Sequence, residues 1–400
     1  MKHDTKEVPT TMRRLFAFLL LTCLLIPCAL AGEAREIPLP EASDLDAALT
    51  DIFPRFRTSG AVVVVAKAGE IVYHYDYGYA CKQDKIPVTP QTYFRAASVT
   101  KLVSAIRMMQ LVEVGLLDLD APIGDYLGFE VRNTLHKREP VTLRQLMTHT
   151  SSVSDSGGFS SNLPLDAFLD ASLKHNGNWH NRAPGGKYQY SNFGAGLMGS
   201  LMEAVTGKNV NDAVHEGVFD PLGIDAAYHI SLLKEQDQAA YMYHSDGSLK
   251  KSPAAYLRES WDASVDPNRH YGLTYGSLWI RGDDLCRLGI ALCEGGTVNG
   301  VNLLEPETVQ LMMSSQKDQG SVTVDSPYGL CMHRVTTLLS DRMLYGHQGM
   351  SDGTLCNLYF DPQSRLVFVL ITNGSSTKQS DYVANLTRAV FKEVWDVWGE

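Results

Sequence analysis

Hydrophobic positions follow two different periods along the chain. Toward both ends, apolar residues form short continuous runs or alternate with polar ones, which is typical of buried and half-buried β-strands. The strands predicted on this basis are residues 61–67, 70–78, 343–345, 355–360 and 366–372. Turn residues join the first two at Ala68-Gly69 and the last two at 361–364, so each pair is expected to form a hairpin.

The remaining apolar positions recur with helical spacing. Leu45, Leu49 and Phe53 mark a helix near the start, and residues 381–397 form an amphipathic helix near the end. The helices expected between them are residues 102–114 before Gly115, 141–149 with Thr142 as cap, 194–205 before Gly207, and short segments within 210–270. The first of these is apolar on nearly its whole circumference, which indicates a fully buried helix.

Strands at both ends and helices in the middle predict an α/β (α+β) fold. One antiparallel sheet would carry the two end helices, and the helical middle would form a second lobe. We expect a single domain over residues 32–400, with the sheet lobe at about 42–95 and 320–400 and the helical lobe at about 96–319. A site is expected between the lobes, shaped in part by the irregular, Ser- and Gly-rich stretch 151–186.

The N-terminal segment has the pattern of a secretory signal peptide. Arg13-Arg14 precede an apolar run that ends at Ala29-Leu30-Ala31, which predicts cleavage near Ala31 and a periplasmic or secreted protein. A transmembrane anchor is the alternative, but the run is short for one, so no stable span is expected in the mature chain. Met1 and Met12 both stay open as the start, because residues 1–11 add nothing to the signal.

Composition narrows the class of protein. A net charge of -10 argues against nucleic acid as a partner, and 44% hydrophobic residues are ordinary for a globular domain. The five cysteines that would remain after cleavage show neither a disulfide framework nor a zinc spacing, so no metal or cofactor is expected. Cys331 and Cys356, placed on predicted strands, could pair or stay as buried thiols. Oligomeric state leaves no mark in the sequence.

The buried helix carries the first candidate chemistry. Ser98 lies at its first turn and Lys101 lies three residues on, on the same face. A serine hydroxyl needs a base to become a nucleophile, and burial can make a lysine amine that base. The alternative is a helix cap with a solvated lysine. Four further Ser-x-x-Lys matches lie in polar or loop-like stretches: Ser231/Lys234, Ser248/Lys251, Ser314/Lys317 and Ser375/Lys378.

Two further motifs could complete a reaction site. Tyr190 could take the Ser98 proton if a neighbouring lysine ammonium lowers the pKa of its phenol, and the Asn192 amide could grip both Lys101 and a substrate carbonyl. The alternative is a buried tyrosine and a loop asparagine. His347-x-Gly349 is placed on an expected edge strand facing the cleft, where Gly349 would let a substrate approach closely. His175-Asn176-Gly177 matches the same pattern.

Together the motifs resemble a known family. Ser98-x-x-Lys101, Tyr190-x-Asn192 and His347-x-Gly349 occur in the order of the penicillin-binding-protein-like serine hydrolases, and more narrowly the chain is similar to class C β-lactamase-related proteins. The flanking stretches that agree are residues 141–151, residues 184–199 and Tyr328-Gly329-Leu330. The resemblance covers about residues 42–398.

The resemblance implies a role for each motif residue. Ser98 would be the acylated nucleophile and Lys101 its proton partner. Tyr190 would be the general base and acid, and Asn192 would bind the substrate amide. Backbone N–H groups of Ser98 and Met350 would form the oxyanion hole.

The chain departs from the family pattern at two positions. His347 replaces the lysine of true β-lactamases and carboxypeptidases, which removes a fixed positive charge for a substrate carboxylate. Ser152 stands where a glycine is usual. By resemblance, the histidine favours an esterase or D-amino-acid peptidase acting on a small-molecule or peptide substrate. The alternatives are a penicillin-binding or sensing module that acylates without turnover, and a true β-lactamase or DD-carboxypeptidase.

Overall fold

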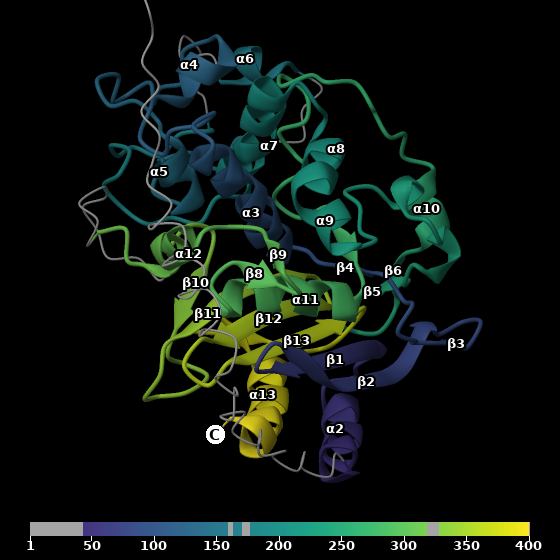
Figure 1. Cartoon of the computed structure of the whole chain (residues 1–400). Helices are drawn as coiled ribbons and strands as arrows, with labels where there is room; N and C mark the ends of the chain where they lie inside the picture. The colour runs from purple at the N-terminus through teal and green to yellow at the C-terminus, as the bar shows by residue number, and fades with distance from the viewer. Residues whose placement is uncertain (1–42, 159–162, 170–176, 318–327, 400) are drawn as a thin grey trace, which may run out of the picture. The chain divides into compact units, whose positions relative to one another are not determined.

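The computed structural model describes residues 43–158, 163–169, 177–317 and 328–399. The predicted signal peptide, residues 1–31, lies outside these residues, as do His175 and Asn176 of the second His-x-Gly match. Figure 1 shows a central sheet with two helices on one face and the rest of the helices on the other.

The central sheet joins the two ends of the chain. Its seven strands run antiparallel in the order β10 (His333–Val335), β11 (Leu344–Ser351), β12 (Thr354–Asp361), β13 (Leu366–Thr372), β1 (Gly60–Lys67), β2 (Glu70–Cys81), β3 (Ile86–Pro87). Strand β13 pairs with β1, with Ala61 opposite Thr372 and Lys67 opposite Leu366. The predicted fold class, an antiparallel sheet built from both ends of the chain, is therefore confirmed.

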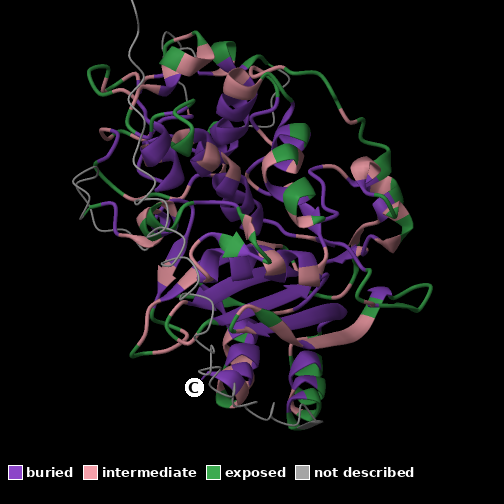
Figure 2. Ribbon diagram, viewed as in Figure 1, coloured by how far each residue is buried: buried purple, intermediate pink, exposed green. Residues whose placement is uncertain are grey.

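Both faces of the sheet are covered, which explains the continuous apolar run of β1. Ala61, Val63 and Val65 pack in one apolar cluster with helices α2 (Ser43–Arg55) and α13 (Asn385–Trp398). Val62 and Val64 point the other way, into the cluster that contains the helical lobe. Because successive side chains of a strand alternate between faces, a strand covered on both sides must be apolar throughout. Figure 2 shows the central strands buried along their length.

Helix α11 (Gly282–Cys293) corrects the predicted division into lobes. Residues 96–319 were assigned to the helical lobe, but α11 packs directly on β13, β1 and β12. Gly289 allows this close contact, because a Cβ atom there would lie 2.5 Å from side-chain atoms of Leu358 and Val367. The chain therefore returns to the sheet once in the middle of its helical part.

The helical lobe is centred on α3 (Val99–Glu113), whose first three turns are buried on nearly every side as predicted. Thr142 caps α5 (Leu143–Met147), and Gly207 ends α7 (Asn192–Thr206), also as predicted. The other described helices are α4 (Ile123–Leu127), α6 (Leu165–Phe168), α8 (Val210–Val214), α9 (Asp220–Leu222), α10 (Pro253–Leu257), α12 (Pro306–Met313) and the short π and 3-10 segments His215–Phe219, Ile230–Leu232 and Gln236–Gln238. Four two-stranded ribbons pair β4 (Phe94–Arg95) with β7 (Trp279–Ile280), β5 (Met242–Tyr243) with β6 (Leu249–Lys251), β8 (Thr297–Val298) with β9 (Val301–Asn302) and β14 (Gln379–Ser380) with β15 (Val383–Ala384).

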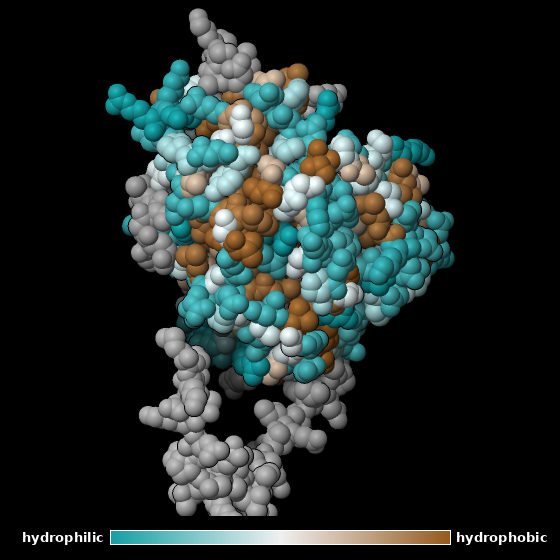
Figure 3. Space-filling view, turned by 45° about the horizontal axis from the view of Figure 1, so that its top comes forward, coloured by the Kyte–Doolittle hydropathy of each residue, from teal (hydrophilic) through white to brown (hydrophobic). Residues whose placement is uncertain are grey.

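The described cysteines are free thiols. Cys331 and Cys356 are both buried and unbonded, which decides between the two alternatives for this pair. Cys331 was predicted to lie on a strand. It lies instead in a turn before β10, with φ +50°. Within the described residues, none of the helices has the length and hydropathy needed to cross a bilayer. Figure 3 shows apolar side chains on the displayed face in small groups separated by polar ones.

Candidate active site

Ser98, Lys101 and Tyr190 meet at the start of α3. Lys101 Nζ lies 3.1 Å from Ser98 Oγ, and the Tyr190 hydroxyl lies 2.9 Å from the same atom. Ser98 makes no side-chain cap hydrogen bond, so the alternative of a simple helix cap is wrong. Ala97, just before it, has φ +45°, a conformation that a residue with a Cβ rarely adopts and that is often found beside reacting groups.

Lys101 is completely buried, which excludes the alternative of a solvated lysine. Its Nζ also donates to Asn192 Oδ1 and to the carbonyl of Tyr275, both at 2.8 Å. Burial lowers the pKa of Lys101 from 10.5 to about 7, although nearby Cys331 and Asp155 act in the opposite direction. Near neutral pH about half of the amine is therefore uncharged and able to accept a proton.

Tyr190 corrects a prediction about charge. We expected a lysine ammonium to lower the pKa of its phenol, but the pKa of Tyr190 is raised, because burial outweighs the hydrogen bond to Ser98. An amine that is only about half protonated near neutral pH stabilises a phenolate less than a permanent ammonium would. The two pKa shifts thus favour Lys101 as the base and Tyr190 as a neutral hydroxyl that passes a proton.

Asp155 is a site residue that the sequence analysis missed. Its carboxylate accepts hydrogen bonds from the backbone N–H groups of Asn192 and Phe193, both at 2.9 Å, from the Ser191 hydroxyl at 2.7 Å and from Asn192 Nδ2 at 3.2 Å. A carboxylate is favoured at a helix N-terminus, where these N–H groups have no partner within the helix. Asp155 therefore fixes the amide that contacts Lys101. Its one sequence signal is that it is the single charged residue in 151–163.

Replacing Asp155 by Asn should lower kcat/KM about 10-fold and the free energy of unfolding by about 1–3 kcal/mol, because an amide cannot accept all four hydrogen bonds. The carboxylate also raises the pKa of Lys101, so its loss should move the midpoint of the pH–rate profile to lower pH. Thermal unfolding and pH-dependent kinetics check both effects. Asp166→Asn, at an exposed position of the same stretch, is the control. An unchanged midpoint would show that Asp155 acts on stability alone.

His347 does not lie where the sequence analysis placed it. Its side chain is completely buried and is absent from the lining of the cavity beside Ser98. Nε2 lies 3.1 Å from the Tyr328 hydroxyl and Nδ1 lies 2.7 Å from the Gln348 carbonyl. Burial, with His333 and Lys101 nearby, holds the pKa of His347 well below its usual value. Substrate contact by this side chain is therefore a wrong prediction, and the imidazole is neutral.

The tautomer of His347 fixes the direction of a hydrogen-bond chain. Because Nδ1 must donate to a carbonyl, Nε2 of the neutral ring accepts from Tyr328. His333 Nε2 then donates to the Tyr328 oxygen, and its Nδ1 accepts from the Tyr359 hydroxyl at 3.0 Å. These neutral groups form one hydrogen-bonded wall behind the cavity. They include His347, which replaces the lysine of true β-lactamases.

Strand β11 also differs from its predicted place at the sheet edge. Strand β10 pairs with its first three residues, so β11 is the second strand, and only the part from His347 onward lacks a partner on that side among the described residues. At Gly349 this part approaches the start of α3 so closely that a Cβ would lie 2.6 Å from Ser98 N. The glycine is thus required by protein packing, and Met350, next to it, lines the cavities together with Ser98.

Two residues in the loop after α5 adopt the left-handed conformation. Ser152, which replaces the usual glycine, has φ +63°, so the chain keeps the loop shape that glycine would favour. Its hydroxyl accepts a hydrogen bond from Asn133 Nδ2 at 2.7 Å. His149 has φ +56°, and its buried ring packs against Tyr190 with centroids 4.3 Å apart. Sequence reasoning gave His149 no role, yet it supports the tyrosine that contacts Ser98.

The other four Ser-x-x-Lys matches are structurally unlike the first. Each serine hydroxyl bonds to a group other than its lysine: Ser231 to His229, Ser248 to Asp246, Ser314 to Leu311 O, and Ser375 to Gly353 O. Ser98 is therefore distinguished from them by its contact with a buried amine.

Two cavities adjoin Ser98. One, of about 300 Å³, is rich in tyrosine and is lined by Tyr188, Tyr190, Tyr328 and Tyr382 with His333, Gln348, Gln379 and Met350. The other, of about 260 Å³, is lined by Arg95, Ala97, Tyr190, Asn192, Tyr275, Gly276, Met350 and Ser351. The serine lies between them, so a substrate can extend to either side of the reacting bond.

A serine hydroxyl touching a buried, partly uncharged amine and a phenol is the arrangement of a serine hydrolase. The sequence profile of the Beta-lactamase family matches residues 47–391, so the chain belongs to that family of serine hydrolases. Esterase EstB of Burkholderia gladioli is 35% identical over 54% of this chain and 57% of its own length. Penicillin-binding protein 4 of Amycolatopsis lactamdurans is 26% identical over 79% of this chain and 81% of its own.

Solved structures agree on the fold. A class C β-lactamase superposes with a TM-score of 0.67 at 17% identity, covering 89% of this chain and 95% of that one. The resemblance seen in the motifs, to penicillin-binding-protein-like and class C β-lactamase-related proteins, is therefore confirmed. This chain spans a little over half the length of the esterase that it matches.

Proposed function

We propose that the protein hydrolyses an ester or amide through an acyl-enzyme on Ser98, as an esterase or D-amino-acid peptidase. The observation that carries the proposal is the position of Ser98 Oγ within 3.1 Å of a completely buried Lys101 and 2.9 Å of Tyr190. Lys101 takes the hydroxyl proton, Ser98 attacks the carbonyl carbon, and Tyr190 passes the proton to the leaving group. Water then releases the acyl group by the reverse proton path.

Two observations favour an esterase or D-peptidase over a carboxylate-anchored β-lactamase. His347, at the position of the usual lysine, is neutral and buried behind Tyr328, so it provides no charge for a substrate carboxylate. The similarity to an esterase at 35% identity points the same way.

We also propose that the protein is exported and that residues 1–31 are removed. The intact mass of the purified exported protein would test this.

Covalent labelling tests the proposal directly. The protein is incubated with a p-nitrophenyl ester and, separately, with a fluorescent penicillin, and intact mass and p-nitrophenol release are followed. Released p-nitrophenol with a transient adduct on Ser98 is expected, and the Ser98→Ala variant should show neither. A stable penicillin adduct without turnover would support the sensing alternative. No adduct from either probe, in a folded protein, would overturn the acyl-enzyme proposal.

A further inference from the structure

The active site continues beyond the cavities that adjoin Ser98. A third cavity, of about 370 Å³, shares Arg95 and Tyr275 with the smaller cavity beside the serine. Aromatic side chains form much of its wall: Tyr228, Tyr256, Trp261 and Trp279. Arg95, three residues before the nucleophile, lines both this cavity and the smaller one beside Ser98.

Arg95 is held in place by neutral groups. Its Nε donates to the Gly276 carbonyl at 3.0 Å and its Nη1 donates to the Tyr256 hydroxyl at 2.7 Å. Within the described residues, its guanidinium also lies over the Tyr256 ring, 5.5 Å from the centroid, and it forms no ion pair with a carboxylate. A guanidinium is always charged and has five N–H donors in a planar fork, which suits a carboxylate. The positive charge beside Ser98 is thus oriented but not neutralised by the described part of the chain.

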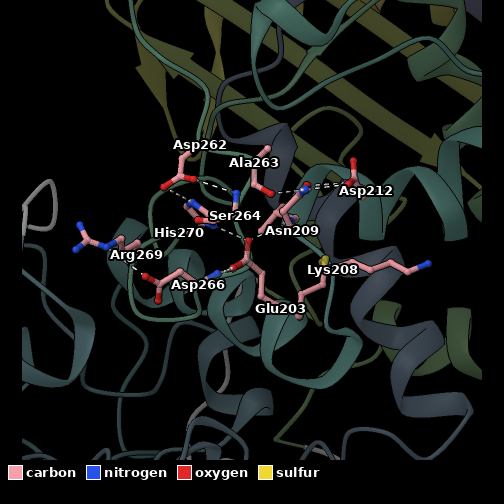
Figure 4. Close-up of polar contacts among 12 residues, drawn as sticks. Glu203, Lys208, Asn209, Asp212, Asp262, Ala263, Ser264, Asp266, Arg269 and His270 are labelled. Atoms are coloured by element: carbon pink, nitrogen blue, oxygen red, sulfur yellow. Dashed lines mark hydrogen bonds and ion pairs between the residues drawn. The ribbon is translucent and has the colours of Figure 1, made fainter.

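His270 is a second basic group in the wall of this cavity. Figure 4 shows its ring on the Glu203 carboxylate, which accepts from Nδ1 at 2.7 Å and from the backbone N–H groups of Val210 and Asp266. Glu203 is fully buried, and its hydrogen bond raises the pKa of His270. The imidazole is more than nine-tenths buried, and its Nε2 has no hydrogen-bond partner in the part of the chain that the structure describes.

The other charged groups of the cavity lie nearer to solvent. Lys251 pairs with Glu259, whose side chain is 58% exposed. Asp262, 55% exposed, stands 3.8 Å from His270 Nε2. His229 is neutral near pH 7, because burial lowers its pKa. The most exposed charged groups of this cavity are therefore the acids Glu259 and Asp262, whereas His270 is buried and Arg95 is half-buried.

We propose that this cavity binds an anionic end of the substrate, and that Arg95, with His270 in the wall of the same cavity, recognises a carboxylate on the acyl group. The inference rests on the proposed hydrolase function and names its substrate class: an ester or amide whose acyl part carries a carboxylate several bonds from the scissile carbonyl. The leaving group then occupies the tyrosine-rich cavity on the other side of Ser98. Arg95 thus supplies the positive charge for a carboxylate that His347 does not.

A pair of matched esters tests this assignment. The ratio of kcat/KM for mono-p-nitrophenyl adipate to that for p-nitrophenyl hexanoate should exceed 1 in the native protein. Arg95→Gln should reduce the ratio about 10- to 100-fold, because a charge-assisted hydrogen bond is lost, whereas Arg95→Lys should retain part of it. Asp262→Asn should raise the ratio about two- to five-fold, because it removes an opposing charge from the rim. Arg269→Gln, an exposed arginine outside the cavity, is the control.

Adipate itself gives a measurement on the native protein if a variant fails to fold. It should inhibit hydrolysis of the neutral ester competitively, and less at high salt. Ser98-dependent hydrolysis without preference for the acidic ester, or a ratio unaffected by Arg95→Gln, would overturn the substrate class and leave the hydrolase intact. Failure of both esters, with no label on Ser98, would overturn the hydrolase proposal and this inference together.

Discussion

Replacing Lys101 by Met should lower kcat/KM by about 10²- to 10⁴-fold, the usual contribution of a positioned general base. Methionine has a similar length, is unbranched and carries no charge, so it fits the buried space. It removes one hydrogen-bond donor from Asn192 Oδ1 and one from the Tyr275 carbonyl, which should cost about 1–3 kcal/mol for each hydrogen bond lost. Thermal unfolding of the variant is therefore measured together with its kinetics. Lys392→Met, on the exposed face of α13, is the control.

The pH dependence follows from the same lysine. Its pKa is lowered from 10.5 to about 7, so the amine is protonated below that value and uncharged above it. Since the uncharged amine is the base, kcat/KM of the native protein should rise with pH, with a midpoint near 7, and then level off. Lys101→Arg should be as inactive as Lys101→Met, because arginine stays charged at all these values. Full activity maintained down to pH 5 would contradict this assignment.

Tyr190→Phe separates the two possible bases. If Lys101 is the base, the residual activity of this variant keeps its midpoint near pH 7 while its kcat falls. If a Tyr190 phenolate were the base, the fall of kcat/KM at low pH would disappear in this variant, because the titrating hydroxyl is removed. The raised pKa of Tyr190 and the lowered pKa of Lys101 both favour the first outcome.

The sequence predicts the fold well where burial leaves a periodic pattern. Strands β1 and β13 are covered on both faces and read as continuous apolar runs, and α3 is apolar nearly all round because protein surrounds it. Strand β11 was predicted over only 343–345, whereas it spans Leu344–Ser351. Glycine, histidine and glutamine fill its middle, and residues of these types carry no strand signal, although the positions are buried.

The sequence predicted those parts of the site that belong to the three motifs. Spacing along a helix brought Lys101 to Ser98, but it could not give the sign of the pKa shift of Tyr190, because that sign depends on how deeply the phenol is buried in the folded protein. His347 was expected to face a substrate because it was placed on an edge strand beside the cleft. Its strand has buried positions on both faces, so the pattern held no information on its direction. Asp155 belongs to no motif, and its role arises from a contact with a helix 37 residues away in the chain.

Gly349→Ala should lower kcat/KM about 10²- to 10³-fold, comparable to the loss of one oxyanion-hole donor. The added Cβ would lie 2.6 Å from Ala96 O and from Ser98 N, both backbone atoms that cannot turn away. Strand β11 must then move from the start of α3. Met350 moves with it, and the gap between its N–H and that of Ser98, the two proposed oxyanion donors, widens.

The direction of the Met350 N–H follows from the hairpin that ends β11. Asp352 and Gly353 both have positive φ, as a two-residue type I′ turn requires, so Ser351 and Thr354 form the hydrogen-bonded pair next to the turn. Hydrogen-bonded and non-hydrogen-bonded pairs alternate along an antiparallel ladder. Met350, one residue back, therefore directs its N–H away from β12, toward the open side of the strand that faces Ser98.

Gly272→Ala is the matched control, because a Cβ there meets only Tyr275 Cε1, at 3.8 Å. Kinetics and thermal unfolding are measured for both variants. Gly349→Ala should lose activity far beyond any loss of stability at the assay temperature, whereas Gly272→Ala should resemble the native protein. If Gly349→Ala unfolds at lower temperature but keeps native kcat/KM, the spacing between β11 and α3 does not control the reaction, and a second oxyanion donor must be sought elsewhere around Ser98.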